Sequence, residues 1–103
     1  MNVKDIAKEL ASLRRVNFNM YAKDFLLTTE KTDDDLLAVL KLAEILKALY
    51  SNNISTKFFN SGLAIAQFRD KSTRTRFSFA SASNLLGLAL QELDETKTKI
   101  SHG

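Results

Sequence analysis

The 103-residue sequence contains no cysteine, no proline and no tryptophan, and it has only three glycines. The absence of cysteine excludes disulfide bonds and thiolate metal sites. Without proline and with few glycines, helices joined by short connections fit better than a loop-rich sandwich. The longest apolar runs, such as Leu85–Leu90, are too short to cross a bilayer, and no apolar segment follows a basic start after Met1. We therefore expect a cytoplasmic protein without a membrane partner.

Apolar residues make up 45% of the sequence, which is enough to bury a core and argues against disorder. The length corresponds to one small domain or to part of a larger one. The formal net charge of +3 is too small to indicate a nucleic-acid partner by itself.

Two amphipathic helices are predicted in the first half. Asn2 can cap the first, with Asp5 as its partner in a capping box, and apolar residues then recur at helical spacing to about Val16. We expect this helix to pack on a core or on another subunit. A membrane-surface helix is the less favoured alternative, because the polar face mixes charges of both signs.

The second helix is predicted to follow a buried apolar anchor, Phe25–Leu27, and to begin after Thr32. Thr32 can cap this helix, and Asp33–Asp35 are favourably placed in its positive first turn. A metal site is the less plausible reading of the three acids, since successive helical residues point in different directions. A wide apolar face follows, so we expect this helix to be well buried.

The second half predicts a strand, a helix and another strand. The continuous apolar run Leu63–Phe68 is typical of a buried parallel strand. A helical pattern then runs from about Thr73 to a left-handed cap at Gly87, and Leu88–Leu93 predicts a second strand parallel to the first. The fold class is therefore α/β, a partial three-layer domain. The helix residues expected to face the sheet or the core are Phe77, Phe79, Ala80, Ala82, Leu85 and Leu86.

Ligands of such sheets bind beyond the carboxyl ends of the strands, where Arg69–Arg76 and Asp94–Gly103 both begin. A helix start suits an anion, because its first N–H groups lack partners within the helix and the macrodipole is positive there. Ser72 and Thr73 add hydroxyl donors, and Arg74 adds a planar guanidinium that fits a phosphate. A phosphate-binding turn is predicted, with a solvated basic helix start as the alternative.

The run Ser72–Phe79, with an apolar strand before it and Leu86–Gly87 after it, resembles the carbamoyl-phosphate signature of the aspartate/ornithine carbamoyltransferase family. The resemblance covers essentially the whole chain. Phe68–Leu88 and the ending Ile100–Gly103 are most similar to the bacterial YgeW type of this family. The resemblance implies the N-terminal part of the carbamoyltransferase fold. It also implies transfer of a carbamoyl group from carbamoyl phosphate to an amine of an amino acid or related compound, without metal or cofactor.

The resemblance implies roles for four residues of the motif. Ser72 and Thr73 would hold phosphate oxygens through hydroxyls and backbone N–H groups. Arg74 would be the catalytic residue, bridging the phosphate and the leaving-group oxygen. Thr75 would reach the phosphate or the carbamoyl carbonyl.

Three other basic residues lie near this motif. The family commonly has a glutamate four residues after Arg76, where this sequence has Ala80, so Arg76 either finds another acid or faces the site. Arg69 and Lys71 are predicted to be solvated charges at the rim.

The loop after the second strand has a further implied role. In the family it reaches the active site of a neighbouring subunit in a trimer, and Thr98, Lys99, Ser101 and His102 occupy that region here. A homotrimer of the full-length parent is therefore expected. An exposed side chain without a role is the alternative for His102.

Length is the main departure from the family pattern, because family enzymes have two domains. We expect residues 1–103 to be the N-terminal portion of a carbamoyl-phosphate-binding domain, without the acceptor-amine domain and inactive alone. The acceptor amine is unknown. One alternative is a non-catalytic interaction or regulatory fragment that retains the phosphate-binding turn. A nucleic-acid binder using the motif's basic residues is weaker, because no exposed aromatic series accompanies them.

Overall fold

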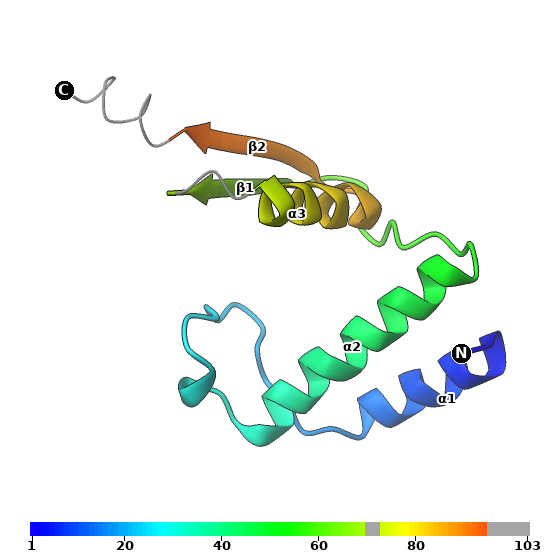
Figure 1. The fold of residues 1–103 in the computed structure, drawn as a ribbon. Coiled ribbons are helices and arrows are strands. Elements are labelled where there is room, and N and C mark those ends of the chain that lie inside the picture. Colours follow the sequence, from blue (N-terminus) through cyan, green and yellow to red (C-terminus); the bar gives the residue numbers. More distant parts are fainter. Residues whose placement is uncertain (70–72, 95–103) are drawn as a thin grey trace. The chain divides into compact units, whose positions relative to one another are not determined.

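The computed structural model describes residues 1–69 and 73–94, and they form the elements shown in Figure 1. The chain divides into two compact units, Met1–Ile54 and Ser55–Gly103. The first contains α1 (Val3–Arg14), the short 3₁₀ helix η1 (Thr28–Glu30) and α2 (Asp33–Ser51). The second contains β1 (Leu63–Phe68), α3 (Thr73–Leu86) and β2 (Ala89–Asp94). The predicted α/β class and element order are confirmed.

Both helices of the first unit begin with the predicted cap residues, and in the structure each cap is part of a capping box, which was predicted only for Asn2 and Asp5. In α1, the Asn2 side chain accepts the Asp5 N–H at 2.9 Å, and the Asp5 carboxylate accepts the Asn2 N–H at 3.3 Å. In α2, Thr32 and Asp35 make the same reciprocal pair at 3.0 and 3.4 Å. Because each box joins residues only three apart, the sequence was sufficient to locate the cap residues.

Asp35 has a second function, which links α2 to the segment before it. Its carboxylate also accepts the Asn19 N–H at 3.1 Å, and the residue is buried. This hydrogen bond, with smaller contributions from Thr32 and Lys31, holds the pKa of Asp35 below its ordinary value, although desolvation acts in the opposite direction. One carboxylate therefore both caps the helix and fixes the preceding segment.

The core of the first unit is small. Ile6 of α1 packs with Ile45 and Ala48 of α2, and Leu13 and Leu49 lie partly buried around them. The prediction that α2 is well buried was wrong for the residues that the structure describes, because α1 covers only one stripe of its wide apolar face. The large side chains left exposed on α2 include Leu37, Val39, Leu40 and Leu42.

The connection between α1 and α2 also differs from the prediction. Phe25–Leu27 was expected to be buried, but within the described chain these three side chains are 48%, 77% and 59% exposed. An apolar groove of about 280 Å³ lies between the end of α1, this connection and α2. It is lined by Leu13, Phe18, Met20, Ala38, Val39, Leu42, Ala43 and Leu46.

The second unit is a parallel strand pair with one helix. β1 pairs with β2 in parallel, with Ala66 opposite Glu92 and Phe68 opposite Asp94. The predicted parallel pairing and the bounds of β1 are confirmed, while β2 begins one residue later than predicted. The carboxyl ends of the two strands therefore lie at the same edge of the sheet.

α3 covers one face of this sheet (Figure 1). On that face Ala66 is buried, and the Phe68 ring meets Phe79 of α3 edge to face, with 6.3 Å between ring centroids. Leu63 and Ile65 alternate to the other face, where they are 61% and 57% exposed. Among the described residues the predicted buried strand is thus covered on one side only.

The end of α3 follows the predicted left-handed cap. Gly87 has φ +93°, its N–H donates to the Asn84 carbonyl, and the next N–H, of Leu88, donates to the Ser83 carbonyl. This pair of bonds is a Schellman motif. A Cβ atom at Gly87 would lie 2.0 Å from the Phe59 carbonyl oxygen, so both the backbone angle and the close approach require glycine.

No helix within residues 1–69 and 73–94 has both the length and the hydropathy needed to cross a membrane.

Candidate functional site

The candidate site lies where β1 passes into α3. β1 ends at Phe68 and α3 begins at Thr73, so residues 69–72 connect them in the sequence. Ser72 and Lys71 lie outside the described residues, whereas Arg69 is described and exposed. The prediction that a helix starts shortly after the carboxyl end of β1 is therefore confirmed.

Thr73, Arg74 and Thr75 are the first three residues of α3, and all three are exposed. Their backbone N–H groups are not needed for the helix's own hydrogen-bond ladder. The first turn contains no acidic residue. Arg74 makes no hydrogen bond or ion pair with another described residue. Its cationic side chain is thus placed at the positive end of a helix, which is a favourable setting for an anion.

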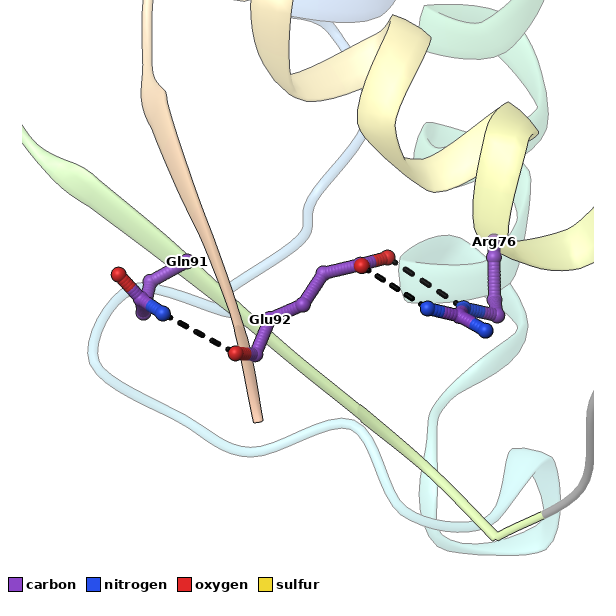
Figure 2. Close-up of polar contacts among 3 residues, drawn as sticks. All are labelled: Arg76, Gln91 and Glu92. Carbon is purple, nitrogen blue, oxygen red and sulfur yellow. Dashed lines mark hydrogen bonds and ion pairs between the residues drawn. The ribbon is translucent and has the colours of Figure 1, made fainter. Parts of the chain in front are cut away.

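Arg76 has a different environment, shown in Figure 2. Its guanidinium donates from Nη2 to Oε2 of Glu92 at 2.9 Å and from Nε to Oε1 at 3.4 Å. Both side chains are about two-fifths exposed. The sequence left Arg76 to find another acid or to face the site, and the structure gives it an acid on β2.

Glu92 is the residue that sequence reasoning missed. It lies on a strand sixteen residues after Arg76, so no helical spacing rule relates the two. A signal was nevertheless present: Glu92 is an acid within an otherwise apolar face of the predicted strand, at an even spacing from Leu88 and Leu90. An acid in that register, opposite a helix with an arginine that lacked its usual partner, could have indicated the pair.

Two aromatic residues of α3 were both expected in the core, and both predictions were wrong. Phe77 is 71% exposed within the described chain, and Phe79 is 39% exposed although its ring contacts Phe68 of the strand. The stripe of α3 with the least exposure instead runs through Arg76, Ala80, Ser83 and Leu86, so Phe77 is turned away from it. Leu85 is 38% exposed and Ala82 is exposed too.

The predicted neighbouring-subunit loop cannot be placed with the site. Thr98, Lys99, Ser101 and His102 lie outside the described residues. The described part of the site therefore consists of Arg69, the first turn of α3 and the Arg76–Glu92 pair.

Residues 23–103 match the family model described as "Aspartate/ornithine carbamoyltransferase, carbamoyl-P binding domain". The chain therefore belongs to the aspartate/ornithine carbamoyltransferase family. The match includes the whole β1–α3–β2 unit and the first turn of α3.

Among curated proteins, the chain is similar to the protein named "Putative carbamoyltransferase YgeW" of Escherichia coli strain K12. The two are 58% identical over 101 residues, which are 98% of this chain and 25% of the relative. Proteins of the same name from E. coli O6:H1 strain CFT073 and from E. coli O157:H7 match to the same extent. The chain thus spans about a quarter of the length of these relatives.

Proposed function

We propose that Ser72, Thr73, Arg74 and Thr75 bind carbamoyl phosphate as part of a carbamoyltransferase. The observation that carries this proposal is the position of Arg74. It is exposed, it makes no ion pair within the described chain, and it is the second residue of a helix at the carboxyl edge of a parallel strand pair. Membership of the carbamoyltransferase family supports the same ligand.

The residues of the turn suit the two ends of this ligand. Helix N–H groups and the hydroxyls of Ser72 and Thr73 would donate to the phosphate oxygens. The guanidinium of Arg74 would donate to the phosphate and to the bridging oxygen, which gains negative charge as its bond to the carbamoyl carbon breaks. The hydroxyl of Thr75 would donate to the phosphate or to the carbamoyl carbonyl.

The reaction proposed for the parent enzyme is attack of an acceptor amine on the carbamoyl carbon, with phosphate as the leaving group. These groups accelerate it by holding the ligand and by stabilising the charge that develops on the leaving oxygen. Removing one such donor commonly lowers a rate by about two to three orders of magnitude.

We propose that the acceptor amine is bound by a part of the parent beyond residues 1–103, so that this chain alone is inactive. We also propose that Thr98, Lys99 and His102 serve a neighbouring subunit's site in a homotrimer of the parent.

A binding titration tests the proposal on the 103-residue chain. The probe is phosphonoacetamide, a stable analogue in which a methylene group replaces the bridging oxygen. Arg74→Ala is expected to weaken its binding by about tenfold to a hundredfold, the usual contribution of a hydrogen bond to a charged group. The matched control is Arg14→Ala, because Arg14 is an exposed arginine in the last turn of α1. Equal affinities for Arg74→Ala and the control would remove the proposal.

A further inference from the structure

We propose that Glu92 is a positioning residue for the anion-binding turn, acting through Arg76 to hold the first turn of α3 against β2. The identity of the anion in this inference rests on the proposed function, whereas the contact between Arg76 and Glu92 is observed in the structure. It assigns different roles to the two arginines of the motif: Arg74 reaches the anion, and Arg76 fixes the turn that carries Arg74.

Helical geometry separates the two arginines. Residues two apart on an α-helix are rotated by about 200°, so they project from nearly opposite sides. The structure agrees with this rotation, because Arg76 is partly covered and reaches the sheet, while Arg74 is exposed. One guanidinium therefore cannot replace the other without rotating the helix.

The strand register places Glu92 where it can receive Arg76. Glu92 is opposite Ala66, and Ala66 lies two residues before Phe68 on the face that α3 covers. From this face the carboxylate accepts two hydrogen bonds from one planar guanidinium (Figure 2). Such a bidentate contact fixes the orientation of the guanidinium relative to the carboxylate as well as their distance, whereas a single hydrogen bond fixes only the distance.

The two ends of α3 are attached to neighbouring segments in different ways, at the last turn through backbone carbonyls and at the first turn through the Arg76–Glu92 pair. At the last turn the backbone itself is tied down, because Thr56 donates its hydroxyl to the Leu85 carbonyl at 2.8 Å and the Phe59 N–H donates to the Leu86 carbonyl at 3.1 Å. At the first turn, the Arg76–Glu92 pair joins the helix to β2 through side chains. A shift of this turn would move Arg74 and the helix N–H groups together, and the geometry of the anion site would change with them.

The sign of one mutational effect distinguishes positioning from simple charge. A carboxylate near an anion repels it, so a purely electrostatic role predicts that Glu92→Gln strengthens anion binding. A positioning role predicts that the same variant weakens it. The pair is partly exposed, so the expected loss is about twofold to fivefold.

The experiment is a double-mutant cycle on the 103-residue chain, with phosphonoacetamide as the probe. We expect Glu92→Gln and Arg76→Gln each to weaken binding by about twofold to fivefold. The double variant should bind no more weakly than the weaker-binding single variant, because both changes break the same contact.

Two further variants test geometry and charge separately. Arg76→Lys keeps the charge but loses the bidentate geometry, and it should bind less well than the wild type. Glu44→Gln, an exposed acid on α2, is the charge-matched control and should not weaken binding. Unchanged or tighter binding by Glu92→Gln, or additive losses in the cycle, would overturn the inference.

A second measurement keeps this test separate from that of the proposed function. In the ligand-free chain, the amide resonances of Thr73–Thr75 are compared between the wild type, Glu92→Gln and Glu44→Gln. Positioning predicts that only Glu92→Gln shifts them, while the amides of α1 and α2 remain unchanged and report that the variant is folded. If these resonances shift but the wild type binds no probe, the proposed function fails and the positioning role stands. If they do not shift, the positioning role fails even if Arg74→Ala weakens binding.

Discussion

The first turns of α2 and α3 carry side chains of opposite charge. α2 begins with Thr32 and three acids, Asp33–Asp35, and its own side chains satisfy backbone N–H groups and complement the positive end of the helix. α3 begins with Thr73, Arg74 and Thr75 and has no acid in its first turn. The comparison teaches that the two helix starts carry charges of opposite sign: the acids of α2 complement the positive end of their helix, whereas Arg74 adds positive charge at the start of α3, which favours an anion.

The largest expected effect comes from giving α3 the kind of start that α2 has. Arg74→Glu should weaken phosphonoacetamide binding by more than about a hundredfold, because a charged donor is replaced by a repelling carboxylate. The same change should leave the helix intact or stabilise it by about 0.3–1 kcal/mol, since an acid in the first turn complements the macrodipole. Calorimetric titration and thermal unfolding of one sample measure both effects. Retained binding would contradict the proposed role of this helix start, and Arg14→Glu in α1 controls for net charge.

The converse change removes the cap of α2. Thr32→Ala eliminates the hydroxyl that accepts the Asp35 N–H at 3.0 Å, so the free energy of unfolding should fall by about 1 kcal/mol. Urea unfolding followed by circular dichroism measures this loss, with Thr32→Ser as the variant that restores the cap. Probe affinity should remain that of the wild type. A loss of affinity equal to that of Arg74→Ala would mean that the two helix starts are not functionally distinct.

A smaller effect is expected at the third residue of α3. Thr75→Val keeps the shape of the side chain and removes its hydroxyl, so one hydrogen bond from an uncharged donor to the phosphate or the carbamoyl carbonyl is lost. Binding of phosphonoacetamide should weaken by about twofold to tenfold, corresponding to about 0.5–1.5 kcal/mol. Thr75→Ser retains the hydroxyl and should bind as the wild type does. Identical affinities for the valine and serine variants would exclude a role for this hydroxyl.

The smallest expected effect is on the pH dependence of the free energy of unfolding, through Asp35 in the first turn of α2. The pKa of Asp35 is lowered in the folded chain, chiefly by the Asn19 hydrogen bond, from an ordinary value of 3.8. The folded state therefore binds this proton less readily than the unfolded state. The resulting stabilisation is fully present above pH 3.8 and is lost as the pH falls through the lower, folded value. Urea unfolding of the wild type and of Asp35→Asn is measured from about pH 6 to about pH 2.5. The free energy of unfolding should fall more steeply with decreasing pH in the wild type than in the variant. Parallel curves would contradict the assignment.

Local patterns predicted the secondary structure well. The cap residues Asn2 and Thr32, the bounds of β1 and the left-handed end of α3 at Gly87 all depend on residues within a few positions of one another. The first turn of α3 was predicted for the same reason, because an apolar strand followed by polar residues and a helical pattern indicates where the helix begins. The position of Thr73–Thr75 thus followed from the sequence, whereas their proposed ligand contacts are for the titrations to decide.

Burial was predicted less well, and the errors have one cause. Phe77 and the apolar face of α2 were assigned to a core because they are hydrophobic, yet in the described chain Phe77 and Leu40 are 71% and 65% exposed. Hydrophobicity predicts that a side chain can be buried, but it does not supply the surface that covers it.

By itself, the sequence determined where the three α-helices and β1 begin, which residues cap the starts of α1 and α2 and the end of α3, and which segment carries hydroxyls and arginine after β1. These features depend on backbone hydrogen bonding and on spacing within a few residues. Only the tertiary structure decided that Arg76 pairs with Glu92 and that Arg74 does not, because strand register and helix rotation bring together residues sixteen positions apart. The same two arginine side chains, two residues apart, acquire different surroundings because the helix turns one toward the sheet and the other away from it.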